Sequence, residues 1–211
     1  MKGLIIKDLV NLKKSGRTIL LIIAFYILFA FMVDSMEFLS GMIILMFAIS
    51  TVSSFSYDSQ AGWDTYARTL PLPKKDFVLS KYVLALLLTV SGTLLTLLLN
   101  WLFGLFKNES NFTEALITSY AIFAVAVIFL AVMLPLIYRF GAERSRIIII
   151  AVFAIPAAAI VVLSRTNALA APSEALLIRL PMLLALSPLG LIAVSGISFA
   201  ISCRIFSRKE V

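Results

Sequence analysis

Residues 115–138 read ALITSYAIFAVAVIFLAVMLPLIY, a mainly apolar segment that contains no charged residue. At about 1.5 Å of rise per residue, an α-helix of this length crosses the roughly 30 Å hydrocarbon core of a bilayer. The chain contains five further apolar runs of comparable character: Thr18–Val33, Phe38–Tyr57, Tyr82–Phe106, Ile147–Leu163 and Leu180–Ile205. The sequence therefore predicts an all-α integral membrane protein with six transmembrane helices.

The composition indicates that most of the chain has the bilayer as its solvent. Hydrophobic residues make up 62% of the 211 residues and charged residues 14%, against about 25% charged in soluble domains. The chain has no histidine and one cysteine, Cys203, so we expect no metal site and no disulfide framework. Cys203 is expected to be inert, with palmitoylation as the alternative. The basic residues that give the chain its net charge of +7 lie between the apolar runs and do not form a patch on a soluble domain, so we expect no nucleic-acid partner.

The distribution of basic residues predicts the orientation in the membrane. With the N-terminus inside, the inner segments carry 15 of the 18 lysines and arginines, in residues 1–17, 58–81, 139–146 and 204–211. Positively charged residues are enriched in the cytoplasmic loops of membrane proteins. We therefore expect both the N- and C-termini to be cytoplasmic.

The first residues of the chain predict a helix that does not span the membrane. Residues 1–16 have helical periodicity but too little apolar length, and they precede a six-span domain over residues 17–211. Polar and apolar residues alternate on two expected faces: Lys7, Asn11 and Lys14 against Ile5, Leu9 and Leu12. This pattern favours an interfacial amphipathic helix, the alternative being a basic leader that only sets the topology.

The sequence offers no residues for covalent chemistry. Every charged residue lies at or outside the boundary of a predicted span, and without histidine neither a Ser–His pair nor a zinc site can form. The chain also lacks a Walker A loop, so any ATP must be bound by another protein. We expect no catalytic residue and no metal ligand, and the chain is not an enzyme by itself.

The cytoplasmic segment 58–81 contains the most informative polar sequence. Trp63, Tyr66 and Leu70 recur at helical spacing, so a short helix over Gly62–Thr69 would place them on one face. Asp64 and Arg68 would form an ion pair between successive turns of that helix. The helix is either an interfacial anchor or a docking helix for a cytoplasmic protein.

Residues 63–82 read WDTYARTLPLPKKDFVLSKY. This stretch resembles the segment after the second span of ABC-2 type permeases, the type-two exporter permeases of bacteria. Among these it is most similar to small permeases such as the transmembrane subunit of the phenol-soluble modulin exporter. The layout of the whole chain fits the same family, with a leading interfacial helix, six spans and a coupling helix.

The resemblance implies a permease subunit of an ATP-binding-cassette exporter in the bacterial cytoplasmic membrane. The permease would work as a homodimer with two separate ATPase subunits, which bind ATP and Mg²⁺, whereas this chain binds no cofactor. The residues implied to dock the ATPase lie in the coupling helix: Gly62, Trp63, Asp64, Tyr66, Arg68 and Thr69.

In this family the second and fifth spans line the transport pathway. The resemblance therefore implies Ser50, Thr51, Ser54 and Pro156 as candidate pathway residues, although serines in spans also bond back to their own helix. Walls with so few charges suit a hydrophobic or amphipathic peptide or a lipid-like molecule better than an ion. The alternatives are a secondary carrier or small channel without an ATPase, and an assembly factor without transport.

Overall fold

The computed structural model describes residues 2–33, 37–63, 66–67, 73–107, 112–141, 144–145 and 174–208. Within these residues the fold is all-helical, without a strand. The helices are α1 (Lys2–Lys13), α2 (Gly16–Val33), α3 (Glu37–Gln60), α5 (Lys74–Lys107), α6 (Phe112–Phe140) and α8 (Glu174–Arg208).

Four of the helices are long and apolar enough to cross a membrane, judged by length and composition. Their candidate spans are Leu39–Gln60, Lys75–Phe106, Thr113–Phe140 and Ser187–Arg208, and α2 contributes a shorter apolar stretch, Gly16–Ala30. These helices correspond to five of the six predicted apolar runs. The fifth predicted run, Ile147–Leu163, lies outside the described residues.

Helix α5 begins earlier than its apolar run. The run was expected from Tyr82, whereas the helix starts at Lys74, directly after Pro73, with Asp76 in its first turn. Proline favours an extended residue before it and suits the start of a helix, and an acidic residue in the first turn complements the helix dipole. The helix therefore carries Lys81 well inside its length.

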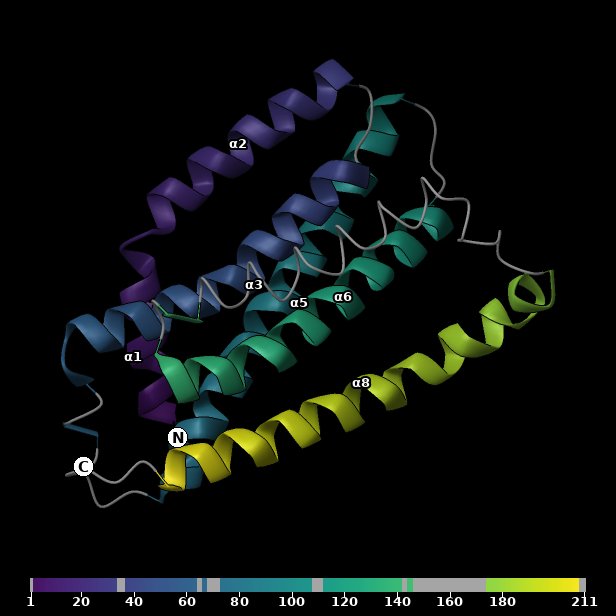
Figure 1. Ribbon diagram of the computed structural model, residues 1–211. Helices are drawn as coiled ribbons and strands as arrows, with labels where there is room; N and C mark the ends of the chain where they lie inside the picture. The colour runs from purple at the N-terminus through teal and green to yellow at the C-terminus, as the bar shows by residue number, and fades with distance from the viewer. Residues whose placement is uncertain are drawn as a thin grey trace, which may run out of the picture.

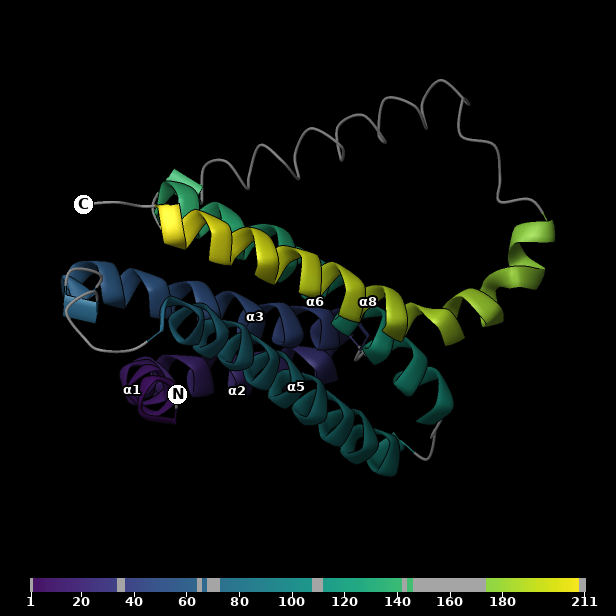
Figure 2. The ribbon, with the colours of Figure 1, turned by 90° about the horizontal axis from the view of Figure 1, so that it is seen from below.

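The spans run side by side, and α1 lies crosswise at one end of them (Figures 1 and 2). In Figure 2, α6 and α8 form one layer and α3 and α5 the other, with contacts between the layers from α3 to α6 and from α5 to α6 and α8. The C-terminal ends of α3, α6 and α8 and the start of α5 gather beside α1. We call this the α1 end of the bundle.

The core of the bundle lies between α3, α5 and α6. Its fully packed cluster consists of small and branched apolar side chains: Ile44, Ala48, Ala85, Ala126, Leu130 and Leu134. Gly92 of α5 lies against Phe47 of α3, and a Cβ atom at Gly92 would stand 2.9 Å from the Cβ of Phe47. Small residues let transmembrane helices approach closely, so Gly92 sets the distance between α3 and α5.

Hydroxyl and amide groups link the helices at several levels. Asn100 of α5 donates a hydrogen bond to the Ser40 hydroxyl of α3 over 2.8 Å, and the hydroxyls of Tyr120 and Ser187 pair across α6 and α8 at 2.5 Å. Such pairs satisfy groups that would be costly to leave alone in hydrocarbon. They fix the register of neighbouring helices.

The face of α1 that packs against the bundle carries Leu4, Asp8 and Leu12, whereas Leu9, which was expected on the apolar face with Leu12, is 43% exposed. Asp8 is held inside by partners on other helices. That residues 1–16 form an interfacial amphipathic helix stays a prediction. Beside α1, the Ser15 hydroxyl pairs with the Tyr57 hydroxyl of α3 at 2.6 Å.

Candidate functional site

Four charged side chains from three helices meet at the α1 end of the bundle. Lys7 and Asp8 come from α1, Asp58 from the last turn of α3 and Lys81 from α5. Lys7 and Asp8 are adjacent, whereas Asp58 and Lys81 are distant in the sequence, and the crosswise placement of α1 over the ends of α3 and α5 brings the four together (Figure 1). We call these four residues the charge cluster.

Each ammonium group of the charge cluster contacts both carboxylates. The Nζ of Lys81 lies 2.6 Å from Asp58 Oδ2 and 3.0 Å from Asp8 Oδ1. The Nζ of Lys7 lies 2.6 Å from Asp58 Oδ1 and 3.2 Å from Asp8 Oδ1. The four groups form a closed ring in which two cations and two anions cancel.

The charge cluster is largely removed from solvent. The side chains of Asp8, Asp58 and Lys81 are 1%, 6% and 9% exposed, and Lys7 is 23% exposed. Lys81 also donates a hydrogen bond to the Ser54 hydroxyl over 2.7 Å. Charges this deeply buried are tolerated only when they are paired and hydrogen-bonded, so the contacts of the ring are mutually dependent.

The predicted coupling segment lies directly on the charge cluster. The Nζ of Lys7 stands 4.0 Å from the centroid of the Trp63 ring, within the range of a cation–π contact. Ala67 is 4% exposed, and a small cavity of about 30 Å³ is lined by Trp63, Ala67 and the four residues of the charge cluster, among others. Trp63 and Ala67, which belong to the described part of the segment, therefore pack against the charge cluster.

Gly62 explains how the chain turns back toward the charge cluster. Its φ angle is +62°, a left-handed conformation that glycine adopts without steric cost. It follows the end of α3 by two residues, and its amide donates to the carbonyl oxygen of Ser59 over 3.2 Å. This turn sends Trp63 onto Lys7.

The structure describes part of the predicted docking helix. Gly62, Trp63 and Tyr66 are described, with Trp63, Tyr66 and Ala67 helical, and the Trp63 and Tyr66 rings lie 5.3 Å apart. Trp63 faces the charge cluster, whereas Tyr66 is 57% exposed. Asp64, Arg68 and Thr69 lie outside the described residues.

The candidate pathway residues of the second predicted span have different partners. Ser50 donates to the carbonyl oxygen of Met46 over 2.8 Å, and Ser54 accepts from Lys81. Thr51 is fully buried, and its hydroxyl has no hydrogen-bond partner among the described residues. Pro156 lies outside the described part of the chain. Whether these residues line a pathway stays a prediction.

The sequence reading missed the charge cluster. It placed Asp58 and Lys81 at the boundaries of spans and left Asp8 without a role. The available signal was Asp8 itself, which stands midway between Leu4 and Leu12 on one helical stripe and so occupies an apolar position. Among the described residues, no group of three or more acidic or cysteine side chains is arranged to hold a metal ion.

Removing Lys7 should loosen Trp63 without unfolding the bundle. The variant Lys7→Ala loses the two ion pairs with Asp8 and Asp58 at a partly exposed position, together with the cation–π contact, so we expect a loss of about 1–2 kcal/mol. The chain has two tryptophans, so in a Trp101→Phe background the fluorescence reports on Trp63 alone. We expect the emission maximum to shift to the red in Lys7→Ala and to stay unchanged in Lys14→Ala, which replaces an exposed lysine. Equal spectra would contradict the contact.

Comparison with known proteins identifies the family. No curated protein and no solved structure matches the chain. The family model described as ABC-2 family transporter protein matches residues 3–207, which is nearly the whole chain and includes the charge cluster and the coupling segment. A multi-pass bundle with a structured segment at the α1 end agrees with that match. The chain therefore belongs to the family of ABC-2 transporter proteins, as the membrane-spanning permease subunit of an ABC transporter.

Proposed function

We propose that this chain forms the export pathway of an ATP-driven exporter in the bacterial cytoplasmic membrane. Two copies of the chain would work with two separate ATPase subunits, which bind ATP and Mg²⁺. The coupling segment would dock the ATPase, and the charge cluster would pass its movement to the spans.

The contact between Trp63 and Lys7 carries this proposal. A force on the coupling segment would reach Lys7 through the indole ring of Trp63, and Lys7 is ion-paired with Asp58 of α3. Asp58 in turn holds Lys81 of α5. Because the four residues of the charge cluster form a closed and buried ring of ion pairs, they would move together. This supports the transmission of a movement from one cytoplasmic contact to α1, α3 and α5.

Six spans and cytoplasmic termini agree with the arrangement of the described helices. α6 ends at the α1 end of the bundle, whereas α8 begins at the opposite end and returns. One further crossing between Phe140 and Glu174 would join them, and the predicted run Ile147–Leu163 supplies it. With six spans, the positive-inside bias puts the coupling segment in the cytoplasm.

A hydrophobic or amphipathic peptide is the proposed cargo. In the described spans the charged residues lie toward the helix ends, and the polar groups between them are mostly hydroxyls with helix partners. Such surroundings do not replace the hydration of an ion, whereas they suit an apolar molecule. The similarity of residues 63–82 to small modulin-exporting permeases supports the same cargo class.

Docking can be tested with an exposed aromatic residue on each side of the membrane. Tyr66 of the coupling segment and Trp101 near the far end of α5 are 57% and 54% exposed. We expect Tyr66→Ala, combined with Arg68→Ala, to reduce ATPase co-purification at least tenfold, because aromatic and arginine side chains dominate protein interfaces. Trp101→Ala should leave co-purification unchanged. The assay uses the tagged chain co-expressed with a candidate ABC ATPase subunit.

Two results would contradict the proposal. If Trp101→Ala releases the ATPase and the Tyr66 variant retains it, the orientation is inverted. If the purified chain alone supports ion-gradient-driven flux in liposomes and binds no ATPase, it is a secondary carrier. Wild-type thermal stability of the Tyr66 variant would show that loss of the ATPase does not arise from misfolding.

A further inference from the structure

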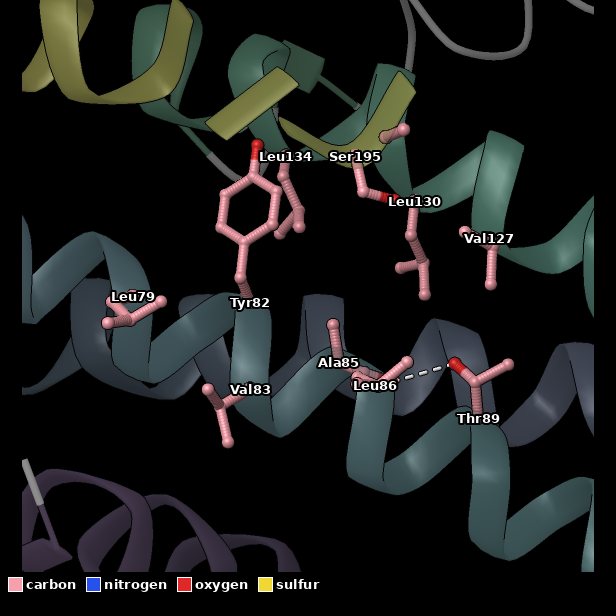
Figure 3. A pocket seen from close by; sticks show the side chains of 11 residues that line it. Leu79, Tyr82, Val83, Ala85, Leu86, Thr89, Val127, Leu130, Leu134 and Ser195 are labelled. Atoms are coloured by element: carbon pink, nitrogen blue, oxygen red, sulfur yellow. Dashed lines mark hydrogen bonds between the residues drawn. The ribbon is translucent and has the colours of Figure 1, made fainter. Parts of the chain in front are cut away.

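A second feature lies beside the core cluster, whose Ala85, Leu130 and Leu134 also line it. It is a cavity of about 240 Å³ between α5, α6 and α8. Figure 3 shows Leu130 and Leu134 of α6 pointing toward α5, and Tyr82 pointing from α5 toward the other two helices. The cavity occupies the part of the spans nearer the α1 end.

The lining of this cavity is suited to hydrocarbon. Its side chains are almost all aliphatic, and two of its three polar side chains, Thr89 and Tyr82, are hydrogen-bonded. The Thr89 hydroxyl donates to the Ala85 carbonyl over 2.7 Å. The Tyr82 hydroxyl pairs with Ser198 and Ser202 of α8 at 2.6 and 2.8 Å. An apolar cavity of about 150 Å³ already takes a molecule such as benzene, so this one has room for several methylene groups.

The cavity opens toward the outside of the bundle. Leu86 lines it and is nevertheless 53% exposed. All three helices that form the cavity are candidate membrane spans at this level. The mouth therefore faces the acyl chains of the bilayer, and a lipid can enter without crossing water.

Two exposed basic side chains lie toward the α1 end of the helices that form the cavity. Lys75 of α5 lies one helical turn before Leu79, which lines the cavity, and Arg204 lies in the last two turns of α8. Asp76 is the acidic neighbour of Lys75 in the first turn of α5. These three residues are positive on balance and lie where lipid headgroups would be.

We propose that the cavity between α5, α6 and α8 binds one acyl chain of an anionic phospholipid, with Lys75 and Arg204 holding its phosphate. Each buried methylene adds about fourfold to the affinity, and each basic side chain near the headgroup adds roughly fivefold. The site is independent of ATPase docking and of the cargo. It rests on the assignment of the α1 end to the headgroup region.

The test uses the purified chain in detergent without an ATPase. Binding of dioleoyl phosphatidylglycerol is compared with that of dioleoyl phosphatidylcholine, which has the same acyl chains, by native mass spectrometry and by the melting temperature. We expect at least tenfold tighter binding of the anionic lipid and a larger rise in melting temperature. Lys75→Ala combined with Arg204→Ala should remove the preference and leave binding of the zwitterionic lipid.

A bulky residue at the mouth supplies the second arm of the test. Leu86→Trp should reduce retention of both lipids severalfold, whereas Leu94→Trp, two turns further along α5 and 62% exposed, should not. Equal binding of the two lipids by the wild type, or unchanged binding by Leu86→Trp, would overturn the proposal. If Leu86→Trp dissociates a dimer, the cavity is occupied by a second copy of the chain. If an amphipathic peptide binds in the cavity and added lipid does not displace it, the cavity belongs to the cargo.

Discussion

Replacing Lys81 by alanine is expected to destabilise the protein by about 3–5 kcal/mol, the usual cost of removing one partner from a buried ion-pair network. Without the ammonium, Asp8 and Asp58 face each other with only Lys7 between them, and both carboxylates remain buried. The Ser54 hydroxyl loses its donor as well. Thermal unfolding in detergent would measure the change.

Charge balance provides the control for the Lys81 prediction. The double variant Asp8→Asn with Lys81→Met leaves Lys7 paired with Asp58, so we expect it to recover at least half of the lost stability. Buried ion pairs are often replaceable by neutral residues of similar shape. Lys14→Ala, an exposed lysine beyond α1, should change the stability by less than about 0.5 kcal/mol. Equal loss in Lys81→Ala and Lys14→Ala would contradict the importance of the charge cluster.

Enlarging Gly92 is expected to have the second-largest effect. A Cβ atom there would meet the Cβ, Cγ and Cδ2 atoms of Phe47 at 2.9, 3.1 and 3.3 Å. Gly92→Ala should cost about 1–3 kcal/mol through overpacking, less up to about 1 kcal/mol gained in helix propensity. Gly92→Leu should cost more, because α3 and α5 would have to separate. Thermal unfolding of both variants tests the order.

Gly196 offers a matched comparison for Gly92. It also lies inside a long apolar helix, α8, but a Cβ atom added there meets nothing within 4 Å. Gly196→Ala should therefore be neutral or stabilising. Combining Gly92→Ala with Phe47→Ala removes the contacts with Cγ and Cδ2 and leaves the contact with Cβ, so the stability losses of the two substitutions should not be additive. A Gly92→Ala protein as stable as Gly196→Ala would contradict the close approach.

Hydropathy and charge predicted the helical class and the positions of the described spans, because both signals are local. An apolar run requires a helix in lipid whatever lies beside it. The start of α5 at Lys74 was less apparent, because its first turn, with Lys74, Lys75 and Asp76, is charged and hydropathy marks only the part inside hydrocarbon. Asp76 and Pro73 were the local signs of the true start.

The candidate site was harder to predict because it depends on contacts over long sequence distances. Asp8 and Lys81 are 73 positions apart, and Lys7 and Asp58 are 51 apart. At the boundary of a span, a charged residue has an ordinary explanation in the headgroup region, so nothing in the sequence separates a buried Lys81 from an exposed Lys75. Without the packing of α1 across α3 and α5, the ring could not be derived.

In the coupling segment, too, a local sequence pattern predicted only part of the arrangement. Its periodicity grouped Trp63 with Tyr66, and the structure keeps their rings in contact. Periodicity does not say which aromatic residue faces inward. Lys7 decides this by attracting Trp63, which leaves Tyr66 the more exposed of the two.

The spacing of the charge cluster also has a consequence for biogenesis. The ribosome delivers Asp8 and Asp58 to the translocon before Lys81 has been synthesised. The early nascent chain therefore contains both carboxylates of the charge cluster but only one of its two ammonium groups, that of Lys7. The α1 helix cannot acquire its final set of contacts until α5 has been inserted. Fragments truncated before Lys81 should therefore leave α1 accessible to proteases, whereas fragments that extend through α5 should protect it.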